Sequence, residues 1–368
     1  MFLATLIGVL CVLVVLVDAF ETIILPRTVM RRLRMSNVFF DVAGNIYRYI
    51  GRMRDCQRKK MLLVAFAPLT LLGLISLWAA LIILGWALIY WSLGIHFSGP
   101  TMTPMSGLYL SGVTFFTLGY GDIVPTDVIG RGLAVLEAGV GFGFLALVIG
   151  YVPVLYTGFS RREVQMLRLD SKAGSDPMGA EILHRYSEAD CMDKLPELLK
   201  DWERFGAESL ESYLSYPLLA YYRSQHDDQS WLKSLTAILD ACALIEMGFE
   251  DEAPWIKEVR FEARSTFAMG RHVIVDLAYI LDVPPTAGEL TRLSPEGLAQ
   301  IRARLDADGL RLRRGPEADR HLTEIRRIYE PYVQGLAQAL ILDLPQWCDP
   351  VEHVDNWQTS AWEGAAHF

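Results

Sequence analysis

Three long apolar runs lie within the first 159 residues, and they constrain the fold more than any other feature of the chain. They cover residues 2–25, 61–93 and 130–158, and each is at least as long as the ~20 residues that a helix needs to cross a bilayer. Because backbone polar groups have no water to bind inside lipid, such segments form helices. The sequence therefore predicts an all-α membrane protein with three transmembrane helices.

The basic residues are unevenly distributed around these runs and predict the orientation of the chain. Ten Lys and Arg side chains lie between residues 27 and 60, against two Asp, whereas residues 94–128 contain no Lys or Arg. Basic loops stay on the cytoplasmic side. We therefore expect residues 1–26 to form a transmembrane helix with its N-terminus outside and residues 27–60 to form a basic cytoplasmic connector, in a protein of the cell inner membrane.

Two interpretations of the first two runs follow from their flanking residues. A cleaved secretory signal is an alternative for the first run, but no basic residue precedes it and no small-residue cleavage site follows it. The second run ends in aromatic residues that suit an interface belt at the membrane surface: Trp86, Tyr90 and Trp91.

Residues 160–368 differ from the first part in charge and in patterning. They hold 23 Lys and Arg against 36 Asp and Glu, a net of −13, whereas residues 1–159 hold 11 against 7, a net of +4; together these give the −9 of the whole chain. Helical periodicity is clear in residues 195–214, 231–245 and 318–342. Pro and Gly interrupt it at residues 173–177, 282–288 and 313–317. We expect an acidic, all-helical cytoplasmic domain.

The composition of this second part also bears on function. An acidic surface argues against nucleic acid as a partner, because phosphate binding needs clustered basic charge. No catalytic motif is found in residues 160–368, so we do not expect an enzyme. The five cysteines are scattered without CxxC spacing, and His226-Asp227-Asp228 is more typical of a solvated helix end than of a metal site.

Residues 103–127, between the second and third runs, are typical of a loop that enters the membrane and returns. Thr103 can cap, and Pro104 can begin, a short helix that ends near Phe116 and is too short to cross the bilayer. The negative end of its dipole would then point into the membrane, where it favours a cation.

The next five residues alternate bulky side chains with glycine. In Thr117-Leu118-Gly119-Tyr120-Gly121 the glycines can adopt positive φ, so successive carbonyls can turn toward one side. Non-helical backbone at membrane depth is tolerated where it is buried in protein or lines a water-filled cavity. One row of carbonyls cannot surround an ion, so we expect several chains to meet around an axis.

The segment from Thr114 to Asp122, TFFTLGYGD, resembles the TxxTxGYGD signature of potassium channels. Residues 61–163 as a whole resemble bacterial channels with two spans around one pore loop. The resemblance implies a homotetramer whose pore domain, residues 61–159, contains an outer helix, the pore loop at 103–127 and an inner helix at 130–159. It implies K⁺ as the permeant ion, bound by carbonyls of the filter, and no cofactor. The filter residues would be Thr117, Leu118, Gly119, Tyr120 and Gly121.

The sequence departs from the pattern of the family in two ways. Leu118 stands where the family has Val, but the carbonyl of this residue, not its side chain, would face the ion. The family often has two tryptophans in the pore helix, and the matching residues here are Tyr109 and Leu110. Tyr109 can still donate to Asp122, whereas Leu110 cannot donate to Tyr120.

Glu137 lies inside the third apolar run, where a charge is costly and often functional. We expect four side chains to support the filter: Tyr109, Thr114, Asp122 and Glu137. Glu137 would do so by accepting a hydrogen bond from Ser111 or Thr114. A direct role for Glu137 with ions or protons is the alternative.

Three glycines, Gly139, Gly141 and Gly143, follow in the same run. No strand precedes this GxGxG, so it is not a dinucleotide site. Close helix packing is one interpretation, and the resemblance implies another, in which Gly141 is a gating hinge. Pro153 further along can also kink the helix.

The role of residues 160–368 is open. The domain can control or assemble the channel, by binding an unknown regulatory ligand or protein, because the inner helix continues into it through a short polar junction at residues 160–164 without a flexible linker. In the alternative, the chain is a membrane-anchored signalling or partner-docking protein, or an enzyme, and this domain carries the main activity.

Overall fold

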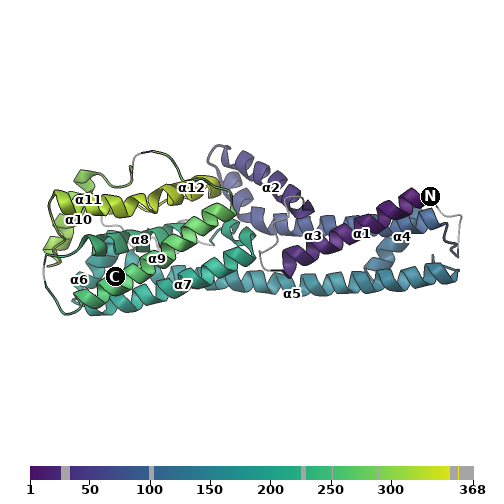
Figure 1. Cartoon of the computed structure of the whole chain (residues 1–368), viewed down its shortest axis with the longest axis horizontal. Helices are drawn as coiled ribbons and strands as arrows, with labels where there is room; N and C mark the ends of the chain where they lie inside the picture. Colours follow the sequence, from purple (N-terminus) through teal and green to yellow (C-terminus); the bar gives the residue numbers. More distant parts are fainter. Residues whose placement is uncertain are drawn as a thin grey trace, which may run out of the picture. The chain divides into compact units, whose positions relative to one another are not determined.

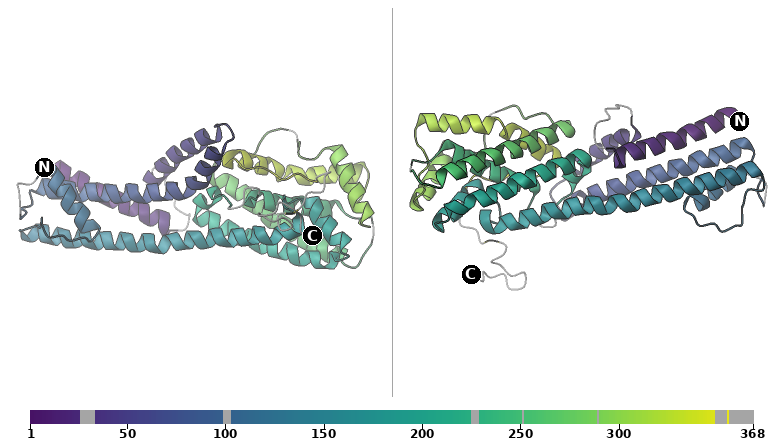
Figure 2. Two further views of the ribbon diagram at one scale, coloured as in Figure 1. Left: turned by 180° about the vertical axis from the view of Figure 1, so that it is seen from behind. Right: turned by 60° about the horizontal axis from the view of Figure 1, so that its bottom comes forward.

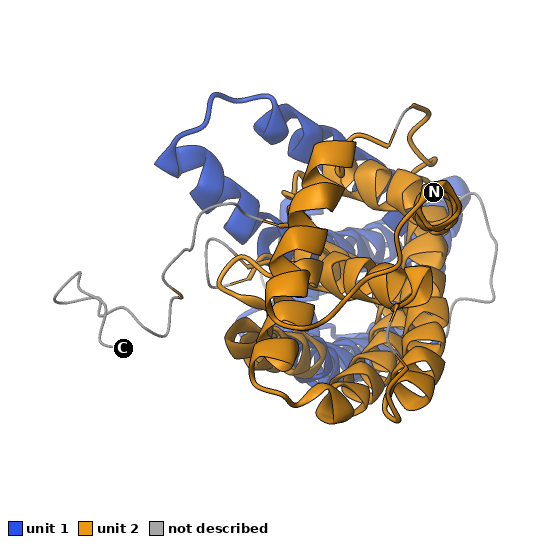
Figure 3. Cartoon of the chain, turned by 90° about the vertical axis from the view of Figure 1, so that its left-hand side faces the viewer, with its two compact units in different colours: residues 1–156 blue, residues 157–368 orange. Residues whose placement is uncertain are grey.

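The structure is a computed structural model that divides into two compact units, residues 1–156 and 157–368 (Figure 3). It describes residues 1–25, 34–98, 103–224, 229–250, 252–288, 290–348 and 355. His226-Asp227-Asp228 lies outside the described residues. In the described part of the chain the regular elements are helices, and two isolated β-bridges pair Phe97 with Pro125 and Phe249 with Leu312. The predicted all-α class is confirmed.

Within the described residues, three helices are long and apolar enough to cross a membrane: α1 (Phe2–Ile23), α3 (Gln57–Leu93) and α5 (Val128–Ala173). They correspond to the three predicted runs. Helix α5 continues past the third run, through the polar junction at residues 160–164, to Ala173. Its last turns carry Met166 and Leu169 into the core of the second unit, where both are buried. The helix is therefore amphipathic beyond the point where it stops being continuously apolar.

Helix α1 packs along α3 in the first unit (Figures 1 and 2). The two backbones approach closely at a pair of glycines: a Cβ built on Gly8 would lie 2.6 Å from the carbonyl oxygen of Gly85. Small residues at such a crossing are typical of helix pairs in membranes. Val12, Val15 and Ala19 of α1 are buried in the same apolar cluster as Leu74, Trp78 and Ile82 of α3. The first run is thus part of the packed unit.

Asp18 joins α1 to α3 and to α2 (Met35–Gly51). Its carboxylate accepts hydrogen bonds from Trp78 Nε1 at 2.9 Å and from the Ser36 backbone N–H at 3.1 Å and hydroxyl at 2.9 Å. Arg34 Nε lies 3.7 Å from the same carboxylate. A buried carboxylate that accepts this many bonds is satisfied, and it ties α1 to α2 and α3.

The short helix α4 (Pro104–Phe115) forms where the sequence predicts it. The Thr103 hydroxyl accepts from the Ser106 backbone N–H at 3.2 Å, and the Ser106 hydroxyl accepts from the Thr103 backbone N–H at 2.8 Å. This reciprocal capping satisfies the free N–H groups of the first turn, and Pro104 needs no partner there. Helix α4 packs against α3, and its Phe115 ring lies against Phe144 of α5.

The second unit is a helical domain that packs around one central helix, α8 (Trp231–Met247). Nearly every residue of α8 is buried, as expected of a helix that is surrounded on all sides. The helices that pack against α8 are α6 (Gly179–Glu188), α7 (Leu195–Ser215), α9 (Ile256–Ile280), α11 (Pro316–Arg327) and α12 (Glu330–Leu340), all labelled in Figure 1. Helix α10 (Pro295–Ala307) and the 3₁₀ turns η1 (Met192–Lys194) and η2 (Pro217–Tyr221) complete the unit.

The predicted helical windows are confirmed with one correction. Residues 195–214 and 231–245 fall in α7 and α8, but the window at 318–342 is not one helix: it breaks into α11 and α12 at residues 328–329. Pro331 lacks an N–H and disfavours a helical residue before it, so the chain restarts there. Tyr329 lies at this break, and its hydroxyl donates to Asp240 Oδ1 of α8 at 2.5 Å.

Candidate functional site

The segment after α4 folds back onto the end of that helix. The N–H of Thr117 donates to the Thr114 carbonyl at 3.0 Å, and the N–H of Leu118 donates to the Val113 carbonyl at 2.8 Å. Both carbonyls belong to the last turn of α4, where they have no partner inside the helix. The chain therefore leaves the helix in a fixed direction.

The backbone from residue 117 to residue 121 alternates in handedness. Thr117, Gly119 and Gly121 have φ values of +56°, +59° and +78°, whereas Leu118 and Tyr120 keep negative φ. Alternation of this kind turns successive carbonyls toward the same side, as the two glycines suggest. Thr117 is the exception to what the sequence indicates, because a β-branched residue rarely adopts positive φ. Its strained backbone marks the first position of the candidate filter.

A hydrogen bond between Tyr109 and Asp122 fixes the end of this segment that follows residue 121. The Tyr109 hydroxyl donates to Asp122 Oδ2 at 2.8 Å, across thirteen residues of chain. The expected hydrogen bond is confirmed. Leu110 is buried in the apolar cluster of α3 and α4. It fills space behind the filter without donating to it.

Glu137 of α5 is completely buried behind α4. It forms a short hydrogen bond with the Ser111 hydroxyl, and its other carboxyl oxygen accepts from the Tyr90 hydroxyl at 2.7 Å. Of the two predicted donors, Ser111 is the one that reaches it. Thr114 instead contributes its carbonyl to the turn at Thr117.

The contact with Tyr90 is one that sequence reasoning missed. The sequence places Tyr90 and Trp86 in an interface belt, but both are buried, and among those three aromatics Trp91 alone is exposed. A helical wheel of α3 would have placed Trp86 and Tyr90, four residues apart, on one face and Trp91 away from it. Tyr90 therefore links the outer helix to Glu137 rather than to the membrane surface.

Gly141 is a close contact between α5 and the end of α4. A Cβ built at this position would lie 2.2 Å from the Phe115 carbonyl oxygen, whereas a Cβ at Gly139 or Gly143 would meet nothing within 4 Å. Helix α5 runs without a break through Gly141 and Pro153. The packing interpretation therefore accounts for Gly141 in this structure.

With this geometry in place, the comparison with known families is informative. Residues 77–157 match the family described as Ion channel. They form an ion-channel pore domain. This pore domain comprises residues 77–93 of α3, the helix α4, the candidate filter segment and the first part of α5, and α1 precedes it.

Individual relatives are similar over different lengths. Protein LctB of Geobacillus stearothermophilus is 34% identical over 84 residues, which are 20% of this chain and 62% of that protein. Protein LctB of Bacillus caldotenax is 36% identical over 84 residues. The chain thus spans less than two thirds of the length of these relatives.

A longer match extends beyond the pore domain. The uncharacterized membrane protein YdjJ of Bacillus subtilis is 24% identical over 246 residues, which cover 64% of this chain and 69% of that protein. No solved structure matches the chain. Three apolar helices and a membrane relative together identify the chain as a multi-pass membrane protein.

Proposed function

We propose that the chain is a potassium-selective channel in which four copies surround one filter. The TLGYGD sequence carries the proposal, because its backbone alternates in handedness at residues 117–121 and is fixed at both ends, by α4 and by Asp122. Carbonyls presented in this way replace the hydration shell of K⁺, the mechanism for which potassium-channel filters are the standard example. The Thr117 hydroxyl adds the innermost oxygen.

The surface of the pore domain supports an assembly of several copies. Leu118 and Tyr120 of the filter are 54% and 69% exposed, and on α5 Val135, Phe142 and Ile149 are each at least 69% exposed. Large apolar patches of this kind mark interfaces with protein or lipid. In a four-fold ring the filters of neighbouring copies cover one another, and α5 lines the axis.

The proposed orientation places the N-terminus outside and residues 27–60 and 160–368 in the cytoplasm. It rests on the ten basic residues of the connector. Cys56 lies in this connector and is exposed, so it reports the side directly. An impermeant thiol reagent applied to intact cells should leave Cys56 unlabelled and should label a cysteine placed at residue 3.

Flux of purified protein in liposomes tests the channel itself. We expect K⁺ to move and Na⁺ to be excluded, and we expect Gly119→Ala to remove this selectivity. Within one chain an added Cβ at Gly119 would meet nothing within 4 Å, so no clash inside the chain adds to the effect of its positive φ. Holding an L-residue in that conformation costs about 1–2 kcal/mol.

Gly112→Ala in α4 is the matched control. It also has free space for a Cβ, but its φ is negative and helical. Selective flux in both variants would contradict the filter assignment, and loss of flux in both would indicate a general intolerance of the pore loop to substitution.

A further inference from the structure

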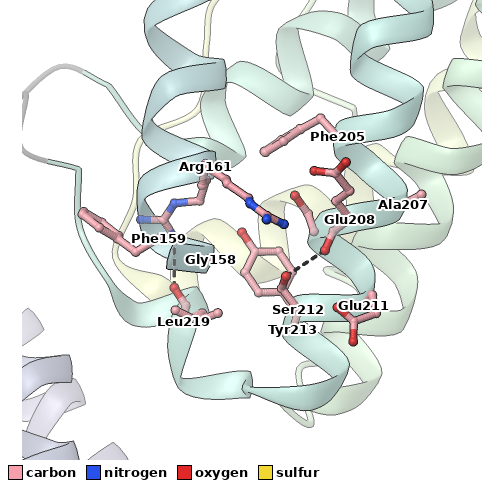
Figure 4. A pocket seen from close by; sticks show the side chains of 12 residues that line it. Gly158, Phe159, Arg161, Phe205, Ala207, Glu208, Glu211, Ser212, Tyr213 and Leu219 are labelled. Carbon is pink, nitrogen blue, oxygen red and sulfur yellow. Dashed lines mark hydrogen bonds between the residues drawn. The ribbon is translucent and has the colours of Figure 1, made fainter. Parts of the chain in front are cut away.

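A cavity of about 330 Å³ lies within the second unit (Figure 4). It is bounded by the part of α5 that follows residue 157, by the second half of α7 and by η2. Its volume is at the lower end of the ~300–1,000 Å³ that ligand sites occupy. A small molecule, rather than a peptide, fits it.

The walls of the cavity are apolar. Phe159 of α5, Phe205 of α7 and Leu219 of η2 line it, and each is more than nine-tenths buried. Such a wall binds an apolar group through exclusion of water.

The floor carries two buried polar atoms, the Tyr213 hydroxyl and Arg162 Nε, which among the described residues have no well-aligned partner beyond the contact between these two side chains. Tyr213 is 2% exposed, Arg162 is 4% exposed, and the two side chains lie against each other. Burial raises the pKa of Tyr213, so its hydroxyl keeps its proton at neutral pH. Both atoms are donors in a place where an unpaired donor is costly.

The rest of the Arg162 guanidinium is fixed in place. Its other two nitrogens donate to the Leu219 carbonyl at 2.9 Å and to the Tyr222 carbonyl at 2.6 Å, and Glu163 lies 3.3 Å away. The donor at Nε is therefore held in one position. Preorganised donors of this kind suit an anionic group such as a carboxylate.

The mouth of the cavity carries charges of both signs. Arg161 extends from α5, and Glu208 and Glu211 come from the facing helix α7 (Figure 4). In the described part of the chain the structure forms no ion pair between Arg161 and either glutamate, although they line the same space. A simple anion would be repelled by the glutamates, and a simple cation by the arginines. A molecule that carries one positive and one negative group can place the negative group beside the arginines and the positive group beside the glutamates.

We propose that this cavity binds a free α-amino acid with a bulky apolar side chain. The carboxylate accepts from Tyr213, Arg162 Nε and Arg161, the ammonium group faces Glu208, and the side chain packs on Phe205 and Leu219. Binding would hold α5 against α7. Any effect on ion flux rests on the proposed channel function, whereas the binding site does not.

Binding to the purified full chain in detergent, measured by titration calorimetry, tests the proposal. The probes are L-leucine, L-phenylalanine and L-tryptophan, and we expect at least one to bind at a single site per chain. N-acetyl-L-phenylalanine lacks the ammonium charge and L-phenylalaninamide lacks the carboxylate, so we expect each to bind at least tenfold more weakly than L-phenylalanine.

Single substitutions locate the site. Tyr213→Phe and Glu208→Gln should each weaken binding of the best probe about tenfold, whereas Glu203→Gln, on α7 but outside the cavity, should leave it unchanged. Equal thermal unfolding midpoints for the variants and the parent exclude a folding defect. The proposal is overturned if no probe binds, if either analogue binds as tightly as L-phenylalanine, or if Tyr213→Phe folds and binds like the parent. Because no step measures flux, failure here leaves the channel proposal standing.

Discussion

Tyr90 of α3 donates a hydrogen bond of 2.7 Å to Glu137 of α5, behind the short helix α4. Ser111 of that short helix contacts the same carboxyl group. One side chain thus connects the three helices of the pore domain. The Ser111 hydroxyl also lies 2.9 Å from the Ile83 carbonyl oxygen. Because this hydroxyl has a single proton, it can donate to Glu137 or to the Ile83 carbonyl, but not to both at once.

The first prediction concerns this connection. Glu137→Ala should destabilise the pore domain by about 1–3 kcal/mol, because it leaves the Tyr90 hydroxyl buried without an acceptor. Glu137→Gln should retain most of the stability and the flux, since its amide can donate to Ser111 while its carbonyl oxygen accepts from Tyr90. Thermal unfolding and liposome flux measure both. If Glu137→Gln is as stable as the parent but does not conduct, the side chain acts through its charge and the support role is wrong.

A second prediction separates packing from hinge motion in the glycine run. Gly141→Ala should lower the unfolding midpoint, because its Cβ would collide with the Phe115 carbonyl oxygen and such overpacking costs about 1–3 kcal/mol. Gly139→Ala and Gly143→Ala have free space and are the matched controls. A hinge at Gly141 would instead change channel opening while stability stayed at the level of the two controls.

The sequence was sufficient for features that depend on local chemistry. The cap at Thr103 and the start at Pro104 follow from the residue types and their spacing, whereas the hydrogen bond from Tyr109 to Asp122 follows from the resemblance to potassium channels. The spans follow from length and hydropathy. Local rules of this kind need no knowledge of which helices meet.

The features that the sequence did not reveal depend on contacts between distant elements. Nothing near Tyr90 indicates that Glu137, 47 residues later, will be its partner. The extension of α5 beyond residue 164 to Ala173 depends on burial of its last turns among helices of the second unit. Positive φ at Thr117 is imposed by its neighbours, against the preference of a β-branched residue.

A third prediction concerns acid stability at the start of α5. Asp127 accepts from the Gly130 N–H at 2.6 Å and from the His96 N–H at 2.9 Å, and these bonds lower the pKa of Asp127 below its usual value. Because the pKa is lower in the folded state, the stabilisation is present above the unfolded pKa of about 3.9 and is lost as the pH falls through the folded value.

Thermal unfolding of the parent and of Asp127→Ala between pH 3 and pH 7 measures this effect. The parent should have the higher midpoint, by a constant difference above about pH 5, and the difference should shrink below about pH 4. A difference that grew on acidification would show that the carboxyl group is stabilised in its protonated form.

The last prediction tests control of the pore by the second unit. An insertion after Glu163 would separate Arg162, bound to the carbonyls of Leu219 and Tyr222, from the buried turns that follow it, so it would disrupt the domain. A Gly/Ser insertion between Tyr156 and Thr157 instead falls at the boundary of the two units. If motion is transmitted along α5, the flexible insert should remove any dependence of flux on pH, divalent ions or amino acids while K⁺ flux itself persists. A helix-forming insert of equal length is the matched control and should preserve more of that dependence. Responses that survive the flexible insert unchanged would mean that the domain serves assembly or partner docking, because a Gly/Ser chain cannot carry torque or displacement to the inner helix.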